Sequence, residues 1–295
     1  MRYIAFIFLG LLGSCAEQTT EYADSATSLT AEVEVTGGTI VGNEREGGLF
    51  EFLGVPYAAP PLGDLRWQPP QPIDGWQGKL DATKPGLPCL QPDTLSEFYE
   101  RAYSETSEDC LSLNVWSRAT TTKDKTPVMV WIHGGALVMG SGRDYDGAPL
   151  TAKGVVLVTI NYRLGPFGFF AHPELSSEDG GGVSGNQGFR DQISALEWVR
   201  DNIEAFGGDP DNVTIFGESA GSWSVSVMQA SPMARGLFHK VIGQSGARFI
   251  PIPDLASDRW GIPSAESWGE TLAVKFSGRD GASLEALRAL PGQQI

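Results

Sequence analysis

Residues 213–221 read Val213-Thr214-Ile215-Phe216-Gly217-Glu218-Ser219-Ala220-Gly221 and say more about the fold than any other part of the chain. The apolar start is typical of a buried strand, and 220–229 is helix-like. Between them lies G-x-S-x-G, the motif of a sharp turn that lifts a serine above a sheet edge. The motif alone is weak in a chain with 37 glycines. Its place between strand and helix predicts a nucleophile elbow with Ser219 at the tip.

Strand-like and helix-like segments alternate on both sides of this turn. Residues 128–132 and 155–161 are nearly unbroken apolar runs, as in strands buried on both faces of a parallel sheet. Residues 191–206 repeat apolar side chains at spacings of three and four, which predicts a helix. Further strands are expected at 111–116 and 241–244, further helices at 265–276 and 283–290, and N-terminal hairpins from 33–35, 39–41 and 49–55. The alternation predicts an α/β fold with a mostly parallel central sheet.

A second glycine-rich turn, His133-Gly134-Gly135-Ala136, directly follows the run 128–132. Glycines here let backbone N–H groups face a cavity without obstruction by side chains. With the N–H of Ala220 at the start of the next helix, they could form an oxyanion hole of three donors. A turn that only needs glycine for its backbone conformation is the alternative interpretation.

Other blocks stand in a fixed order around the two turns. They are Phe52-Leu53-Gly54-Val55-Pro56-Tyr57-Ala58, Glu108-Asp109-Cys110-Leu111-Ser112-Leu113-Asn114-Val115, Asn161-Tyr162-Arg163-Leu164-Gly165, Gly185-Asn186-Gln187-Gly188 and Phe206-Gly207-Gly208-Asp209-Pro210. From about residue 33 onward the chain thereby resembles the type-B carboxylesterase (cholinesterase-like) family of the α/β-hydrolase fold. The resemblance implies a serine esterase of that fold, with its C-terminal strands missing from these 295 residues.

The resemblance also implies a role for individual residues. Ser219 corresponds to the nucleophile that forms an acyl-enzyme, with Gly134, Gly135 and Ala220 as the oxyanion hole. Glu218 is expected to tune the site rather than serve as the triad acid, because adjacent side chains on a sharp turn diverge; His133 is expected to order the oxyanion turn. The implied structural positions are the disulfide Cys89–Cys110 and the salt bridges Arg66–Glu108 and Arg163–Asp191.

A serine nucleophile needs a base, and the base needs an orienting acid; this fold places both after the serine. His239 is the only histidine after Ser219, and it lies only 20 positions on, at the entry to a strand. His172 precedes the serine and is expected to be structural. We therefore expect the triad acid and histidine beyond residue 295, and an N-terminal fragment that is inactive alone.

Two functions from different classes fit this sequence. The first is a carboxylic-ester hydrolase acting on an uncharged or weakly polar small-molecule ester. The second is a non-catalytic adhesion or binding module, since some relatives with this fold only bind. Binding modules usually lose the nucleophile or its surroundings, whereas Ser219 and the turn at His133 are intact here. The enzyme is therefore the favoured interpretation.

The N-terminus predicts export. Residues 1–15 form a signal peptide, with a charged start, a short apolar run and small residues before Cys15. Leu12-Gly13-Ser14-Cys15 resembles a lipoprotein box, which would lipidate Cys15; ordinary cleavage with an incidental cysteine is the alternative. Residues 16–32 are expected to be a flexible tether, and 33–295 an incomplete hydrolase domain. The protein would then be secreted, periplasmic or membrane-anchored, where a disulfide between the two remaining cysteines is permissible.

Charge and composition exclude several classes. The net charge of −15, from 21 basic and 36 acidic side chains, argues against nucleic-acid binding, which needs clustered Lys and Arg. Three histidines and three cysteines show no ligand spacing, so neither a metal nor another cofactor is expected. Contact with a membrane is expected only through the N-terminal lipid.

Overall fold

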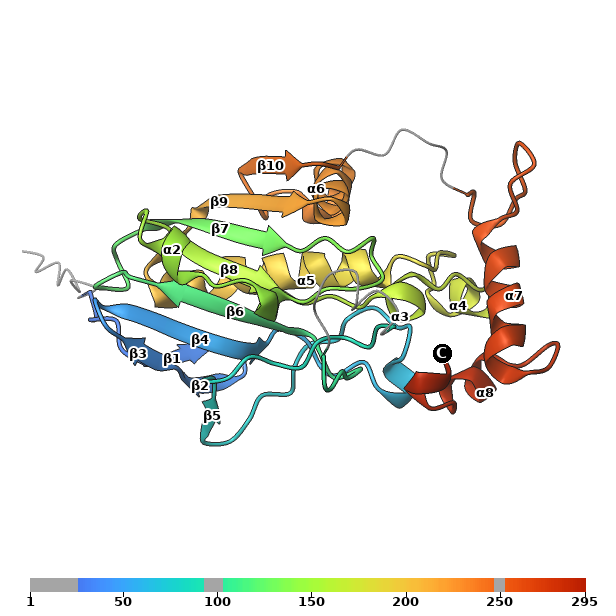
Figure 1. Cartoon of the computed structure of the whole chain (residues 1–295), viewed down its shortest axis with the longest axis horizontal. Helices are drawn as coiled ribbons and strands as arrows, with labels where there is room; N and C mark the ends of the chain where they lie inside the picture. Colours follow the sequence, from blue (N-terminus) through green and yellow to red (C-terminus); the bar gives the residue numbers. More distant parts are fainter. Residues whose placement is uncertain (1–25, 93–102, 247–252) are drawn as a thin grey trace, which may run out of the picture.

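The computed structural model describes residues 26–92, 103–246 and 253–295. A seven-stranded sheet in the order β10-β9-β7-β8-β6-β4-β3 forms its centre, and a small sheet in the order β1-β2-β5 lies at one side (Figure 1). The strands are β1 (Glu32–Val35), β2 (Gly38–Val41), β3 (Asn43–Arg45), β4 (Leu49–Pro56), β5 (Lys79–Asp81), β6 (Ser112–Ser117), β7 (Thr126–Ile132), β8 (Val156–Ile160), β9 (Gly208–Glu218) and β10 (Lys240–Gln244).

Helices lie on both faces of the large sheet. Those in the described ranges are α2 (Ala148–Thr151), α3 (Gly165–Phe169), α4 (Pro173–Glu178), α5 (Gln187–Asn202), α6 (Ala220–Ala230), α7 (Ala265–Ser277) and α8 (Leu284–Arg288), with 3-10 turns η1 (Gly63–Leu65), η3 (Gly142–Asp144), η4 (Ile203–Phe206), η5 (Pro232–Ala234) and η6 (Gly292–Gln294). α5 and α6 cover the face that carries Val130 and Ile215, and α2 packs against the opposite face near Trp116.

The apolar runs in the sequence become the middle of the sheet. All five residues of β8 are buried, and Val128, Val130 and Ile132 of β7 have no exposed surface. Strands covered on both faces need apolar side chains at nearly every position, which is why these runs do not alternate with polar residues. Both glycine-rich turns begin where these buried strands stop, at the C-terminal ends of β7 and β9.

The α/β fold and its N-terminal hairpins are as predicted, but the described sheet is mixed rather than mostly parallel. β7, β8, β9 and β10 pair in parallel, but β6 is antiparallel to β8, and β4 is antiparallel to β6 and β3. The described sheet is therefore mixed, with three parallel and three antiparallel pairings. An apolar run in the sequence does not reveal the direction of the neighbouring strand.

The structure also corrects the boundary of the expected tether at 16–32. Leu29 is buried, and its N–H donates to the carbonyl of Thr120 at 2.9 Å. Ser28 forms an isolated bridge with Thr121, and β1 already begins at Glu32. The domain thus includes residues 27–32. Residues 1–25, with the predicted signal peptide and Cys15, lie outside the described residues.

The C-terminal helices form a separate apolar cluster at the end of the sheet. Phe276, Leu284 and Leu287 from α7 and α8 pack against Trp67 and Phe170. Figure 1 shows these helices beyond the C-terminal ends of the parallel strands β7, β8 and β9, away from β10. Within the described ranges, no helix has both the length and the apolar character needed to cross a membrane.

Candidate active site

Ser219 occupies a strained turn between β9 and α6. Its φ of 54° and ψ of −118° lie in a region that is costly for a residue with a side chain. The turn is possible because two glycines touch: a Cβ at Gly217 would lie 2.5 Å from the carbonyl carbon of Gly221. The Ser219 N–H donates to the carbonyl of Gln244 at 2.8 Å, which ties the turn to β10. The predicted elbow is therefore present, with Ser219 at its tip.

The turn after β7 lies beside this elbow. A Cβ at Gly134 would be 2.8 Å from the carbonyl oxygen of Glu218 and 3.3 Å from Cβ of Ser219. Gly135, Ala136 and Leu137 follow with φ of 97°, 56° and 64°, so the chain makes one left-handed turn. Only a glycine fits at position 134, because any side chain would strike the elbow.

The left-handed turn leaves backbone donors free at its start. The N–H groups of Val138 and Met139 both donate to the carbonyl of Gly135, at 3.0 and 3.1 Å. In the described ranges no hydrogen bond uses the N–H of Gly134, Gly135 or Ala136, nor that of Ala220 at the start of α6. These N–H groups can donate hydrogen bonds to an oxygen that develops negative charge. Ala136 was not predicted, since an alanine in the left-handed region has no signal in the sequence.

His133 lies beneath this turn and supports it. Its ring stacks on Tyr162 with centroids 4.4 Å apart, and Nδ1 is 2.9 Å from the carbonyl oxygen of Gly134. Burial lowers the pKa of His133 from 6.5 to about 4, so the ring is neutral at neutral pH. A neutral ring that donates from Nδ1 keeps Nε2 unprotonated, and Nε2 is buried without a partner among the described residues. His133 is placed to order the turn and not to reach a substrate.

The other two histidines are engaged elsewhere. Nδ1 of His172 accepts from the N–H of Glu174 at the start of α4. Nδ1 of His239 accepts from the N–H of Val213 at 3.1 Å. β10 runs parallel to β9, so His239 lies at the opposite end of the strand from Ser219, about 16 Å away for five residues of strand. No described side chain forms a hydrogen bond with the Ser219 hydroxyl.

A cavity of about 320 Å³ opens above Ser219. Glu218, expected to tune the site, is exposed and lines this cavity, pointing away from the buried core. The residues around the cavity come from the elbow, the oxyanion turn, the segment after it and the loop after Cys89; they are Gln91, Tyr103, Gly134, Gly135, Met139, Gly140, Asp144, Tyr145, Glu218 and Ser219. Among the described residues, no group of three or more His, Cys, Asp or Glu side chains is arranged to hold a metal.

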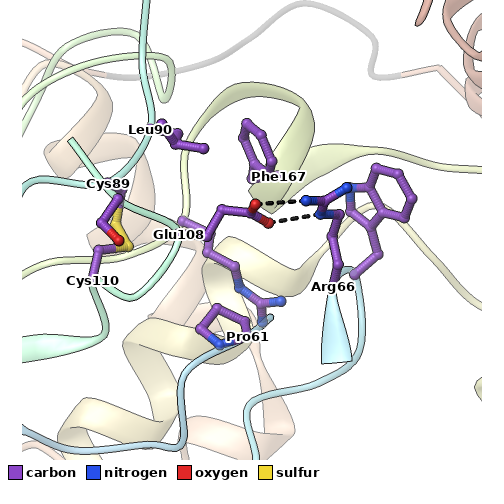
Figure 2. A pocket seen from close by; sticks show the side chains of 10 residues that line it. Pro61, Arg66, Cys89, Leu90, Glu108, Cys110 and Phe167 are labelled. Carbon is purple, nitrogen blue, oxygen red and sulfur yellow. Dashed lines mark hydrogen bonds and ion pairs between the residues drawn. A yellow bond between two sulfur atoms is a disulfide. The ribbon is translucent and has the colours of Figure 1, made fainter. Parts of the chain in front are cut away.

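The disulfide and the first structural pair line a second, smaller pocket. Cys89 and Cys110 form a disulfide. Figure 2 shows Glu108 next to this bridge, facing Arg66 through two hydrogen bonds of 2.6 and 2.7 Å. The same guanidinium also donates to the backbone carbonyls of Leu287, Arg288 and Leu290. Arg66 thereby joins the end of α8 to Glu108, in the loop closed by the disulfide.

The second pair is buried more deeply, under the segment after β8. The carboxylate of Asp191 has no exposed surface. It accepts hydrogen bonds from three donors of Arg163: the backbone N–H at 3.0 Å, Nε at 2.8 Å and Nη2 at 2.7 Å. This pair joins α5 to the chain that follows β8.

Known proteins share both sequence and fold with this chain. Residues 29–295 match the Carboxylesterase family. The chain is 47% identical over 213 residues to fumonisin B1 esterase of Sphingopyxis macrogoltabida and 48% identical over 222 residues to para-nitrobenzyl esterase of Bacillus subtilis. These alignments cover 72% and 74% of this chain.

A carboxylesterase structure from Geobacillus stearothermophilus superposes with a TM-score of 0.77 at 40% identity and covers 90% of this chain. The chain spans about half the length of the proteins it matches: 39% and 44% of the two relatives, and 52% of this structure. The α/β-hydrolase fold and the resemblance noted in the sequence are both confirmed. The chain belongs to the carboxylesterase family.

Proposed function

We propose that the complete protein hydrolyses carboxylic esters through an acyl-enzyme on Ser219. One observation carries this proposal. A strained elbow brings Ser219 beside a turn whose first backbone N–H groups have no hydrogen-bond partner among the described residues, and both line the same cavity. Strain of this kind persists where the surrounding structure enforces it, and such positions cluster at active sites. The family match supports ester hydrolysis as the reaction class.

The reaction follows from this arrangement. Ser219 Oγ attacks the ester carbonyl carbon while a base takes the hydroxyl proton, and the carbonyl oxygen becomes negative. That oxygen accepts hydrogen bonds from amides of the oxyanion hole, for which Gly134, Gly135, Ala136 and Ala220 supply the free N–H groups. When the intermediate collapses, the C–O bond breaks and the leaving alcohol takes the proton. Water then attacks the acyl-enzyme in the same manner and releases the carboxylic acid.

The base and its acid belong to polypeptide outside these 295 residues. The support is the placement of the three histidines, since His133 is buried and His172 and His239 are engaged far from the serine hydroxyl. Without a base the serine is a weak nucleophile. The 295-residue chain alone is therefore inactive, or retains only what the oxyanion hole contributes.

The substrate is a small, uncharged or weakly polar carboxylic ester. Glu218 is an exposed carboxylate in the cavity wall, and the net charge of −15 repels anionic esters at long range. The relatives named above act on different esters, so the family leaves the acyl and alcohol groups open. Pocket walls contributed by the rest of the protein would determine them.

We also propose export, with residues 1–15 as the signal and Cys15 as the lipidated residue. The disulfide Cys89–Cys110 supports an oxidising compartment. Labelling of growing cells with a palmitate analogue tests the lipid directly. The wild-type protein should carry the label and Cys15→Ser should lose it; an unlabelled, cleaved wild-type protein would contradict lipidation.

Labelling with a fluorophosphonate tests the enzyme. Intact mass should show one adduct on the complete protein, none on Ser219→Ala and none on the folded 295-residue chain. An adduct on the 295-residue chain that disappears in Ser219→Ala would mean that a base lies within it. An unlabelled, folded complete protein would favour the adhesion module over the esterase.

A further inference from the structure

The side chain of Gln91 bonds both backbone polar groups of Gly140. Its Nε2 donates to the Gly140 carbonyl at 3.1 Å, and its Oε1 accepts from the Gly140 N–H at 2.8 Å. Nε2 also donates to the carbonyl of Cys89 at 3.0 Å. A carboxamide offers a donor and an acceptor side by side, which an ionised carboxylate does not. Gln91 therefore links the disulfide loop to the segment that ends at Gly140.

Gly140 ends the segment that follows the oxyanion turn, and it packs against the first residues of the turn. Its φ is 105°, and a Cβ there would lie 2.6 Å from Nδ1 of His133 and 3.0 Å from the carbonyl oxygen of Gly134. At Gly135 a Cβ would lie 2.2 Å from the carbonyl oxygen of Met139. The turn and the segment that ends at Gly140 are thus in direct contact. Whatever fixes Gly140 also fixes the amides of the turn.

The base of the Gln91 side chain is itself anchored. Cys89 is held by the disulfide to Cys110. The N–H of Leu90 donates to the carbonyl of Ser107 at 3.1 Å, and the N–H of Ser107 donates to the carbonyl of Pro88 at 2.9 Å. Gln91 follows directly on this tied segment. A side chain whose backbone is tied in this way, and whose own carboxamide makes three hydrogen bonds, can hold its partner in one position.

We propose that Gln91 is a positioning residue for the oxyanion hole. It acts through Gly140 and holds the amides of Gly134, Gly135 and Ala136 in place opposite Ser219. The catalytic half of this inference rests on the proposed esterase function. The structural half does not, because it concerns the turn alone.

Two substitutions separate the donor and acceptor roles of the side chain. Gln91→Glu keeps an acceptor for the Gly140 N–H but sets a carboxylate against the Gly140 carbonyl. Gln91→Met keeps the length of the side chain and removes both bonds. Gln71→Met is the matched control, because the exposed Gln71 side chain donates only to the carbonyl of Pro69.

Hydrogen exchange of the 295-residue chain tests the structural half. Exchange of the amides of 138–140 should be at least 10-fold faster in both Gln91 variants and unchanged in the control, with the exchange of α5 the same throughout. Exchange within twofold of the wild type in both variants would overturn the proposal. A variant that fails to fold shows faster exchange in α5 as well, and the other variant then decides.

Fluorophosphonate kinetics of the complete protein test the catalytic half. Misplacing one oxyanion donor costs up to the 10²–10³-fold typical of removing it, so Gln91→Met should lower the limiting labelling rate by 10-fold or more. The concentration of reagent at half-saturation should stay within twofold, which a general loss of structure would not give. An unchanged limiting rate would overturn this half. A wild type that does not label refutes the esterase instead, and hydrogen exchange still decides the role of Gln91 in the turn.

Discussion

Gly221→Ala should destabilise the domain by forcing α6 away from β7. A Cβ at position 221 would lie 2.0 Å from the carbonyl oxygen of Ile132 and 3.0 Å from that of His133. Close contacts between carbon and carbonyl oxygen lie at about 3.3–3.6 Å, so the two elements must separate by about 1.3 Å. Neither partner is a flexible side chain, and the shift is therefore taken up by the backbone.

In overpacked protein cores such backbone shifts typically lower the free energy of unfolding by about 1–3 kcal/mol, and we expect a loss of this size for Gly221→Ala. Urea denaturation of the 295-residue chain measures the free energy of unfolding. Gly181→Ala is the matched control: its φ is not left-handed, and the new Cβ would meet only a carboxylate oxygen of Asp179 at 3.1 Å, not the backbone of a neighbouring strand. A Gly221→Ala variant within about 0.5 kcal/mol of the wild type, the range of neutral surface changes, would refute the reasoning.

The same substitution should impair the chemistry. Ser219 would move with the start of α6 while the oxyanion turn stays on β7. A misplacement of about 1 Å can cost about 10²-fold in rate. Fluorophosphonate labelling of the complete protein measures this, and labelling at the wild-type rate would show that the elbow tolerates the displacement.

Three other changes have expected outcomes. Burial holds the pKa of His133 at about 4, below its ordinary 6.5. The unfolded chain therefore binds a proton here before the folded chain does, and the free energy of unfolding should fall by about 3 kcal/mol as the pH drops from 6.5 toward 4. Urea titrations at several pH values should show a steeper loss for the wild type than for His133→Phe. Asp191→Asn should lower the free energy of unfolding by about 3–5 kcal/mol, because it leaves the buried guanidinium of Arg163 without its charge partner. Asp201→Asn, in an exposed ion pair, is the control and should lower it by less than about 1 kcal/mol in the same assay. Replacing both Cys89 and Cys110 by serine should lower the free energy of unfolding by about 3 kcal/mol, and a loss below about 1 kcal/mol would contradict the loop-entropy account.

Much of the centre of this fold could be predicted from local pattern. The apolar runs of β7 and β8 and the periodicity within α5 are properties of short segments, and those elements lie within a few residues of their predicted positions. The elbow at Ser219 could also be predicted, because so sharp a turn needs glycine at fixed distances. α5 begins at Gln187, earlier than the expected 191, since its first turn contains the closely packed Gly188 and has no apolar spacing.

Features that depend on distant partners could not be predicted. Leu29 is one apolar residue in a polar stretch, and its burial depends on pairing with residues 120 and 121. The antiparallel half of the sheet depends on the path of the chain between strands. Gln91 has no motif at all, because its importance comes from the backbone of Gly140, 49 positions further along.

Trapping the acyl-enzyme tests the central claim most directly. The complete protein is mixed briefly with an activated small carboxylic ester, quenched in acid, and its peptides are analysed by mass. We predict one acyl group on the peptide that contains Ser219, and neither adduct nor hydrolysis in Ser219→Ala. An acyl group on another residue, or hydrolysis that persists in Ser219→Ala, would contradict the account.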